Sequence, residues 1–274
     1  MTEVIGLTLK LCWYDGTLKN SGTVELAIDD PGLIYGATVF TTLRVYGGSL
    51  DRPIVNWTQH CDRLKNTIQT FGWCEPDWQR IREGAEVTIA HYPVLRITIF
   101  PDGRELIMGR ELPPDLAQRQ QQGISVVVLD APQFRRSLPS HKTGNYLASY
   151  LALQAAKKEG ASDAILVDDR GRWLETSIGN LWGWRDGHWW TPPLQGGILP
   201  GLMRSQLIDW LTTQGELVKE QPWTSDLIRG FEAMAISNSV MELVPIREIL
   251  SGADRLIYPA NTSELATLRQ FFVQ

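Results

Sequence analysis

The sequence has few of the residues that hold metal ions or build disulfide frameworks. Its three cysteines, Cys12, Cys61 and Cys74, are odd in number and show no paired short spacing. Neither a disulfide framework nor a zinc site is therefore expected. The four histidines also lack metal-ligand spacing, so we predict that the protein binds no metal.

An excess of positive charge and a long apolar run are missing as well. Lysine and arginine number 26 against 31 acidic residues, and the net charge of -5 comes without a basic tract, which argues against nucleic acid as a partner. No apolar run approaches the roughly 20 residues that cross a bilayer, and the sequence starts without a signal pattern. These absences predict a cytoplasmic protein that binds neither nucleic acid nor membrane.

What the sequence does contain is periodic apolar patterning over most of its length. Period-2 alternation predicts strands over residues 4–14, 36–46 and 94–100, the first of them opening a hairpin at Asp15-Gly16. An apolar stripe at helical spacing is formed by Trp57, Cys61, Leu64, Ile68 and Phe71. Gly72 ends this predicted helix, and Asp77 is placed to cap the next one.

A polar stretch separates the two halves of the chain. Residues 113–122 show no apolar period, and we predict that they link a domain at 1–112 to a domain at 123–274. Strands are predicted beyond the linker over 124–129, 164–167, 173–177 and 232–236, with a hairpin over 180–191. Helices are predicted over 146–158, 201–213 and 263–272. This irregular alternation favours a mixed α/β fold of the α+β type.

Lys142 stands where a buried-strand pattern gives way to a helical pattern. A lysine that acts as a nucleophile must be partly desolvated so that its amine can lose a proton, and the segment Ser140 to Tyr146 could provide such a place. The alternative is a solvated loop lysine. Phosphate-loop, GxGxxG, GxSxG and HExxH motifs are all absent, which removes several other kinds of active site.

Two further segments could bind an anion. Glycines and a proline precede a predicted helix in the segment from Gly197 to Arg204, and free amides at a helix start attract phosphate. Ser237-Asn238-Ser239 places three small hydrogen-bonding residues after a buried strand. The alternative for the glycine-rich segment is an ordinary turn with a proline near the first helical position. The alternative for the Ser-Asn-Ser segment is a turn or a helix cap.

Glu175 is the fourth element, within Leu174 to Ser177. A carboxylate at this place could lie against a pyridine nitrogen and keep it protonated, which makes the ring an electron sink. The alternative is a surface glutamate on a strand.

Taken in order, these elements resemble the class IV pyridoxal-phosphate enzymes, over about residues 35–245. The family includes branched-chain aminotransferases, D-amino acid aminotransferases and aminodeoxychorismate lyases. Its pattern is a lysine followed by Asn-Tyr, a glutamate thirty-odd residues later, a GxLPGxxR turn, a Ser/Thr turn before Val-Pro, and an HxxRL helix. The matching residues here are Lys142 with Asn145-Tyr146, Glu175, Gly197 to Arg204, Ser239 with Val244-Pro245, and His60 to Leu64.

The resemblance implies a two-domain fold type IV architecture, with a smaller N-terminal α/β domain and a larger β-barrel-like C-terminal domain with helices. It implies a homodimer that binds pyridoxal 5'-phosphate and a small-molecule substrate. Lys142 would hold the cofactor as a Schiff base and then shuttle protons, Tyr146 would contact the ring hydroxyl, and Glu175 would face the ring nitrogen. The phosphate would be held by Arg63, the amides of Leu202 and Met203, and Ser239.

Within the family, Phe40-Thr41-Thr42-Leu43-Arg44 resembles the lyase pattern, where branched-chain aminotransferases usually have Phe-Glu-Gly. The lyase converts 4-amino-4-deoxychorismate into 4-aminobenzoate and pyruvate in folate biosynthesis. On this interpretation Thr42 would contact the substrate or a water, and Phe40, Arg44 and Asn238 would bind the substrate. The alternatives are a branched-chain or D-amino acid aminotransferase and a non-catalytic binding module.

The sequence departs from the lyase pattern at two places. Relatives often carry an Arg-Gly segment after the strand that corresponds to residues 94–100, whereas this chain has Pro101-Asp102-Gly103-Arg104. An expected substrate-facing arginine is thereby missing. The usual acidic residue after Tyr-Gly is Ala37. Both changes leave the expected cofactor site intact, and both concern the substrate.

Overall fold

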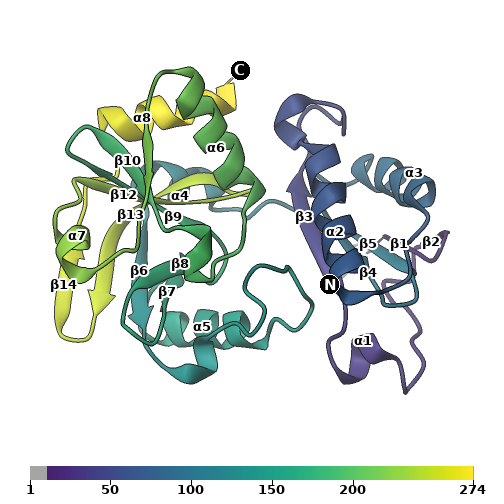
Figure 1. The fold of residues 1–274 in the computed structure, drawn as a ribbon. Coiled ribbons are helices and arrows are strands. Elements are labelled where there is room, and N and C mark those ends of the chain that lie inside the picture. The colour runs from purple at the N-terminus through teal and green to yellow at the C-terminus, as the bar shows by residue number, and fades with distance from the viewer. Residues whose placement is uncertain (1–10, 274) are drawn as a thin grey trace, which may run out of the picture. The chain divides into compact units, whose positions relative to one another are not determined.

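The computed structural model describes residues 11–273 of the chain (Figure 1). Its contacts divide the chain into two compact units, one of Met1–Leu112 with Thr143–Asn145, the other of Pro113–Lys142 with Tyr146–Gln274. The predicted strand over 4–14 lies partly outside the described residues, which contain its end and the hairpin at Asp15-Gly16. None of the helices in residues 11–273 combines the length and apolarity that a membrane span requires.

The described part of the first unit contains a five-stranded antiparallel sheet in the order β2-β1-β5-β4-β3. Its strands are β1 (Cys12–Tyr14), β2 (Thr17–Lys19), β3 (Val39–Arg44), β4 (Val94–Ile99) and β5 (Glu105–Arg110). Helices α2 (Trp57–Phe71) and α3 (Trp78–Ile89) cover one face of this sheet (Figure 1). The short α1 (Pro31–Ile34) and the 3-10 turn η1 (Pro53–Val55) lie in its connections.

Local sequence signals account for both long helices of this unit. The predicted apolar stripe gives α2 its buried face, and Gly72 ends the helix at a φ of 65°, a backbone conformation that glycine adopts without a steric penalty. The Asp77 side chain caps α3 as predicted, because it accepts hydrogen bonds from the amides of Gln79 and Arg80, each at 3.0 Å. Leu64 and Ile68 pack on Leu43 and its core neighbours, and burying each such side chain contributes about 1.5–3 kcal/mol.

The second unit is built on a larger mixed sheet, nine strands among the residues that the structure describes. Its strands are β6 (Ile124–Leu129), β7 (Asp163–Val167), β8 (Trp173–Thr176), β9 (Asn180–Arg185), β10 (His188–Thr191), β11 (Val218–Glu220), β12 (Ala233–Asn238), β13 (Glu242–Ser251) and β14 (Asp254–Ile257). Strand pairs run in the cycle β9-β12-β13-β6-β7-β8, and β8 pairs back with β9. The sheet therefore closes on itself and is barrel-like.

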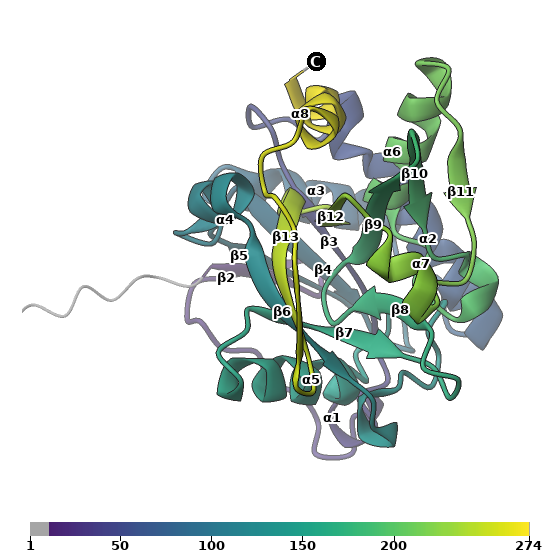
Figure 2. The ribbon, with the colours of Figure 1, turned by 90° about the vertical axis from the view of Figure 1, so that its left-hand side faces the viewer.

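Helices surround this closed sheet. They are α4 (Leu116–Gln122), α5 (Leu147–Lys158), α6 (Leu202–Thr213), α7 (Ser225–Arg229) and α8 (Ser263–Arg269), with 3-10 turns η2 (Pro132–Phe134), η3 (Leu194–Gly196) and η4 (Gln270–Val273). Figure 2 shows α5 beside β6 and β7, which it contacts. Helix α4 occupies the stretch expected as a linker, and it packs against β13, where Gln120 Nε2 donates to the Met241 carbonyl at 3.0 Å.

Candidate active site

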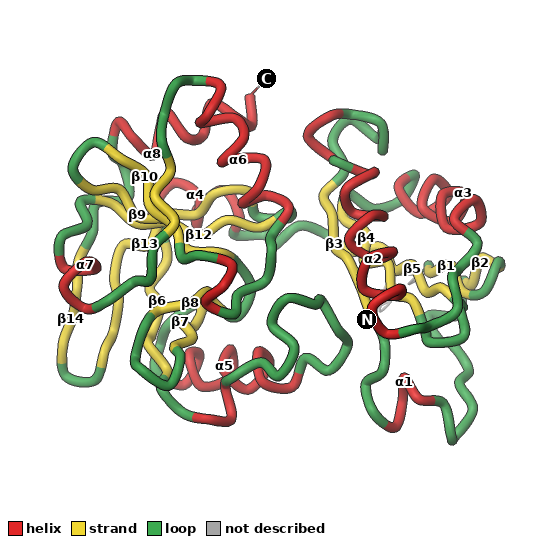
Figure 3. The backbone as a smooth tube through the Cα atoms, in the orientation of Figure 1, coloured by secondary structure: helices red, strands yellow, loops and turns green. Residues whose placement is uncertain are grey.

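A long loop connects β6 to α5 (Figure 3). Lys142 lies near the end of this loop, shortly before α5 begins at Leu147. Its side chain is half-buried, and its Nζ lies 5.8 Å from the ring centroid of Tyr146. The Tyr146 hydroxyl donates a hydrogen bond to the Ser177 carbonyl at 2.8 Å, and burial raises the pKa of this hydroxyl. The loop thus holds the predicted amine and the predicted phenol side by side.

Glu175 is a buried carboxylate of the same unit, on β8, with 5% of its surface exposed. Arg136 Nη1 donates to its Oε1 at 2.6 Å, and the Leu199 amide donates to its Oε2 at 3.1 Å. Burial raises the pKa of this carboxyl, while the Arg136 guanidinium, the Leu199 amide and the Lys142 charge act against that rise. A carboxylate has about four acceptor sites, so Glu175, with two of them used, keeps acceptor capacity for a further donor.

Arg136 was missed in the sequence analysis. It comes from the loop that carries Lys142, and its Nη2 also donates to the His141 carbonyl at 2.8 Å. A buried glutamate requires a cationic or hydrogen-bonding partner, so the need for such a residue could have been predicted from the sequence. No periodicity or motif marks which arginine supplies it.

Residues 177–179, the loop between β8 and β9, accept hydrogen bonds from two of the predicted site residues, Tyr146 and Asn238. Three side-chain hydrogen bonds involve this loop or flank it: Tyr146 to the Ser177 carbonyl at 2.8 Å, Asn238 Nδ2 to the Ile178 carbonyl at 3.2 Å, and Asn180 Nδ2 to the Leu199 carbonyl at 3.0 Å. Beneath the loop lies the fully buried Asp163, whose Oδ1 accepts from the Ser177 hydroxyl. Burial raises the pKa of the Asp163 carboxyl to about 6.

The predicted phosphate turn leads into α6 as expected. Gly201 is the residue before the helix, and no side chain caps the amides of the first turn, which leaves the Leu202 and Met203 amides available to an anion. A Cβ at Gly201 would lie 1.9 Å from Asn180 Oδ1, so only glycine fits. Arg204 does not serve this turn, since it is buried and donates to Thr191, to the Pro192 carbonyl and to Glu220.

The Ser237-Asn238-Ser239 segment spans the last two residues of β12 and the first residue of the turn into β13. Asn238 Oδ1 accepts from the amides of Val240 and Met241 at 2.9 and 2.8 Å, so this side chain shapes the turn. Ser237 is buried, and its hydroxyl accepts from Trp182 Nε1 at 2.9 Å. Ser239 is half-buried, as Asn238 is, and its hydroxyl takes no part in the hydrogen bonds just described for Ser237 and Asn238.

The remaining predicted site residues belong to the first unit, where β3 separates them by face. Thr41 points toward α2 and accepts from Arg63 Nη2 at 2.7 Å. The Arg63 Nε is shielded and has no hydrogen-bond partner among the described residues, and burial lowers the pKa of its guanidinium to about 10. Such an orphaned donor fits an anion as its missing partner.

Phe40, Thr42 and Arg44 lie on the other face of β3, as the alternation predicts. Phe40 is opposite Thr98 and Thr42 is opposite Arg96 on β4. Two groups of predicted residues result, one in each unit. Within the first unit, Arg63 lies on the helix side of β3 and Phe40, Thr42 and Arg44 lie on its opposite face.

The family model described as "Amino-transferase class IV" matches residues 38–249 of the chain. Among characterised sequences, a D-alanine aminotransferase of Listeria monocytogenes is 27% identical, covering 93% of this chain and 92% of the relative. A branched-chain-amino-acid aminotransferase of Salmonella typhimurium is 24% identical, covering 86% of this chain and 84% of the relative.

Solved structures share the fold. The Escherichia coli branched-chain amino acid aminotransferase superposes with a TM-score of 0.81 at 22% identity, over 97% of this chain and 94% of that one. A candidate 4-amino-4-deoxychorismate lyase of Legionella pneumophila gives 0.78 at 21% identity, over 92% and 96%. A hypothetical aminotransferase from Mycobacterium tuberculosis in its PLP-bound form gives 0.81 at 21%, over 95% and 96%.

Pyridoxal 5'-phosphate is the cofactor of class IV aminotransferases. The donor set of this chain fits it. The second unit offers a half-buried amine at Lys142, a buried carboxylate with spare acceptor capacity at Glu175, and uncapped helix amides after Gly201. These are the groups that an aldehyde, a pyridinium and a phosphate require.

Proposed function

Because the chain belongs to the class IV aminotransferase family, whose members depend on pyridoxal 5'-phosphate, we propose that it is a 4-amino-4-deoxychorismate lyase. The reaction releases 4-aminobenzoate and pyruvate for folate biosynthesis. We propose that it acts in the cytoplasm as a homodimer, which is the arrangement that the family resemblance implies.

One observation carries the choice of reaction. The strand face that bears Phe40 continues with the hydroxyl of Thr42 and the guanidinium of Arg44, where branched-chain aminotransferases usually have a Phe-Glu-Gly sequence. A hydroxyl and a cation on this face suit an anionic substrate that must lose an oxygen leaving group. The fold that this chain shares with the Legionella pneumophila protein agrees with the proposal.

We assign the cofactor contacts as follows. Lys142 would hold the aldehyde, Glu175 would face the ring nitrogen, and Tyr146 would contact the ring hydroxyl. The Leu202 and Met203 amides would bind the phosphate, together with Ser239 and Arg63. When bound, the cofactor supplies an aldehyde that captures the substrate amine and a protonated ring that withdraws electrons.

The chain's own groups would then move two protons. The Lys142 amine, once free, takes the proton from the ring carbon that bears the substrate nitrogen. The bond from the neighbouring carbon to the enolpyruvyl oxygen would break, and Thr42 would deliver a proton to the leaving group directly or through a water. Aromaticity is gained, pyruvate leaves, and neither an oxidant nor an amino acceptor is consumed.

An assay with and without a keto acid tests this proposal. Purified holoenzyme is incubated with 4-amino-4-deoxychorismate, and the fluorescence of 4-aminobenzoate is followed. We expect product without any keto acid, at a rate that added 2-oxoglutarate does not change. Turnover only in the presence of a keto acid would reject the lyase.

The second candidate is an aminotransferase acting on branched-chain or D-amino acids. Its support is the sequence similarity to the Salmonella typhimurium and Listeria monocytogenes enzymes, at 24% and 27% identity. The same assay discriminates, because an aminotransferase requires both an amino donor and a keto acid. Keto-acid-dependent turnover of leucine or D-alanine would favour this reading.

A further inference from the structure

Asp163 is the first residue of β7, and none of its surface is exposed. Its Oδ1 accepts hydrogen bonds from the Ser177 hydroxyl and from the Ala164 amide, the latter at 2.8 Å. Its Oδ2 is also shielded from solvent, and it has no hydrogen-bond partner among residues 11–273. One oxygen of this carboxylate is thus left unbonded, whereas buried polar groups in native proteins are nearly always hydrogen-bonded.

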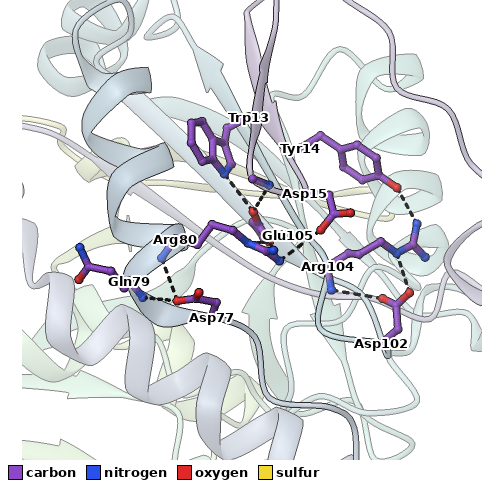
Figure 4. Close-up of polar contacts among 10 residues, drawn as sticks. Trp13, Tyr14, Asp15, Asp77, Gln79, Arg80, Asp102, Arg104 and Glu105 are labelled. Atoms are coloured by element: carbon purple, nitrogen blue, oxygen red, sulfur yellow. Dashed lines mark hydrogen bonds and ion pairs between the residues drawn. The ribbon is translucent and has the colours of Figure 1, made fainter.

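Glu105, the first residue of β5, shows how a buried carboxylate with a structural role is bonded (Figure 4). It is fully buried as well. Its Oε1 accepts from Trp13 Nε1 at 2.9 Å and from the Gly16 amide at 2.8 Å, and its Oε2 accepts from Arg80 Nε and Nη2 at 3.1 and 2.6 Å. These bonds tie the β1-β2 hairpin and α3 to β5. Within residues 11–273, no such cation pairs with Asp163.

Asp163 therefore opposes folding at neutral pH. Burial raises the pKa of its carboxyl to about 6, above the ordinary value of about 3.9. A carboxyl whose pKa is raised on folding lowers stability as the pH rises from the unfolded pKa to the folded one, and the loss persists at higher pH. A side chain that is buried at a loss of stability points to a functional role.

Residues 177–179, which we call the Ser177 loop, join Asp163 to Tyr146. The Ser177 hydroxyl donates to Asp163, and the carbonyl of the same residue accepts from the Tyr146 hydroxyl at 2.8 Å. The Ser177 amide in turn donates to the Ala164 carbonyl at 2.9 Å. Ser177 is thus fixed against β7, and the direction of its carbonyl determines where the Tyr146 proton points.

Strand β12 restrains the other side of the Ser177 loop. Asn238 Nδ2 donates to the Ile178 carbonyl at 3.2 Å. A Cβ at Gly179 would lie 2.8 Å from the Ser237 carbonyl oxygen, so the loop backbone packs closely on this strand. The bond to Asp163 is the matching restraint on the side of β7.

The charge of Asp163 reaches the phenol as well. Burial raises the pKa of the Tyr146 hydroxyl, the Arg136 charge acts against that rise, and the charges of Glu175 and Asp163 add to it. The phenol therefore keeps its proton and donates it to the Ser177 carbonyl. Its oxygen retains lone pairs that can accept a hydrogen bond from a ligand hydroxyl.

We propose that Asp163 is a positioning residue of the cofactor site, which acts through the Ser177 loop to orient the Tyr146 hydroxyl. The inference rests on the proposed function in one respect, the assignment of Tyr146 to the ring hydroxyl of pyridoxal 5'-phosphate. Asp163 itself would not touch the cofactor. It fixes the carbonyl that receives the phenol proton, and the lone pairs of the phenol oxygen are thereby directed at the ring hydroxyl.

A double-mutant cycle on cofactor affinity tests this proposal. The dissociation constant of pyridoxal 5'-phosphate is measured by equilibrium dialysis against the full-length apoprotein, so no substrate and no turnover are involved. Asp163→Ala should weaken binding roughly two- to tenfold, the range that the net contribution of one hydrogen bond gives. In a Tyr146→Phe background the same substitution should change the constant by less than about twofold, because the hydroxyl that it orients is gone.

Three further variants complete the cycle. Asp163→Asn should recover part of the affinity, because an amide oxygen still accepts from Ser177 but carries no charge. Ser177→Ala removes the same bond from the loop side, so it should act like Asp163→Ala in both backgrounds, and it decides the test if Asp163→Ala does not fold. Asp168 follows β7 at its other end, where it pairs with Arg172 at 2.6 Å and is 13% exposed. Asp168→Ala should leave cofactor affinity unchanged.

The outcomes separate this proposal from the proposed reaction. Weakened binding that disappears in the Tyr146→Phe background supports the role of Asp163 whichever reaction the protein catalyses, and keto-acid-dependent turnover would reject the lyase alone. Asp163→Ala protein that binds the cofactor as tightly as the wild type would overturn the role. An equal loss in both backgrounds would overturn it too, because a purely structural residue behaves in that way. Tyr146→Phe protein with wild-type affinity would overturn both the Tyr146 assignment and this role.

Discussion

Removing the Arg136 side chain should destabilise the protein most strongly at neutral pH. The guanidinium lies 2.6 Å from Glu175, with 15% of the arginine side chain and 7% of the glutamate side chain exposed. Loss of one partner from a buried pair costs about 3–5 kcal/mol, because the other charge stays buried without compensation. We expect Arg136→Met to lower the free energy of unfolding of the apoprotein by about 3 kcal/mol at pH 7.5.

The pH dependence follows from the direction of the Glu175 shift. Burial already raises the pKa of this carboxyl above its ordinary value, and the Arg136 guanidinium opposes that rise. The variant pKa is therefore higher still. A carboxyl whose pKa is raised on folding loses stability as pH increases from its unfolded pKa, about 4.3, to its folded one. The deficit of the variant should shrink as pH is lowered from 7.5 to 5, because a protonated Glu175 no longer needs the cation.

Urea unfolding of the apoproteins at pH 7.5 and pH 5, followed by tryptophan fluorescence, measures both effects. The neighbouring Arg135 gives a matched control, since it pairs with Asp130 at 3.4 Å and 41% of its side chain is exposed. Arg135→Met should cost less than about 1 kcal/mol, as exposed ion pairs do. A deficit for Arg136→Met that is equally small, or equal at both pH values, would refute the reasoning.

Two further substitutions test the cofactor assignments. Lys142→Ala should abolish turnover and the near-visible absorbance band that borohydride removes from the wild type, whereas Lys157→Ala, at an exposed position on α5, should keep both; a persisting band would contradict the role of Lys142. Gly201→Ala should weaken cofactor binding more than roughly tenfold, because its Cβ would come within 1.9 Å of Asn180 Oδ1 and displace the α6 turn. Equilibrium dialysis measures this, and unchanged binding would separate the turn from the phosphate.

Features governed by neighbours in sequence were predictable. The stripe of α2 with its Gly72 terminus and the Asp77 cap of α3 each depend on residues within a turn or two, so periodicity and capping rules located them. The positions of Lys142 and Glu175 came from the order of motifs along the chain. That the Lys142 charge acts on the Glu175 carboxyl is a tertiary fact, and the motif order implied it only through the family resemblance.

Features governed by distant partners were not predictable. Helix α4 buries only Leu116 of its seven residues, so its sequence shows no apolar period that would predict a helix. Its stability comes from contacts with β13. Strand β13 itself was unrecognised, since it includes Pro245 and has a register shift opposite β6. The pairing of Arg136 with Glu175 spans 39 positions in the chain, beyond the reach of any local rule.

Glu175 also has a structural role, because it takes part in the closure of the barrel-like sheet. Its backbone pairs with Asn180 where β8 meets β9, so the seam of the cylinder and the carboxylate assigned to the ring nitrogen belong to one residue. Asn180 likewise contributes to the seam and to the turn that begins α6. Glu175 and Asn180 therefore serve both the closure of the sheet and the proposed cofactor site. A relative that lost the reaction would still need these two positions for the pairing of β8 with β9.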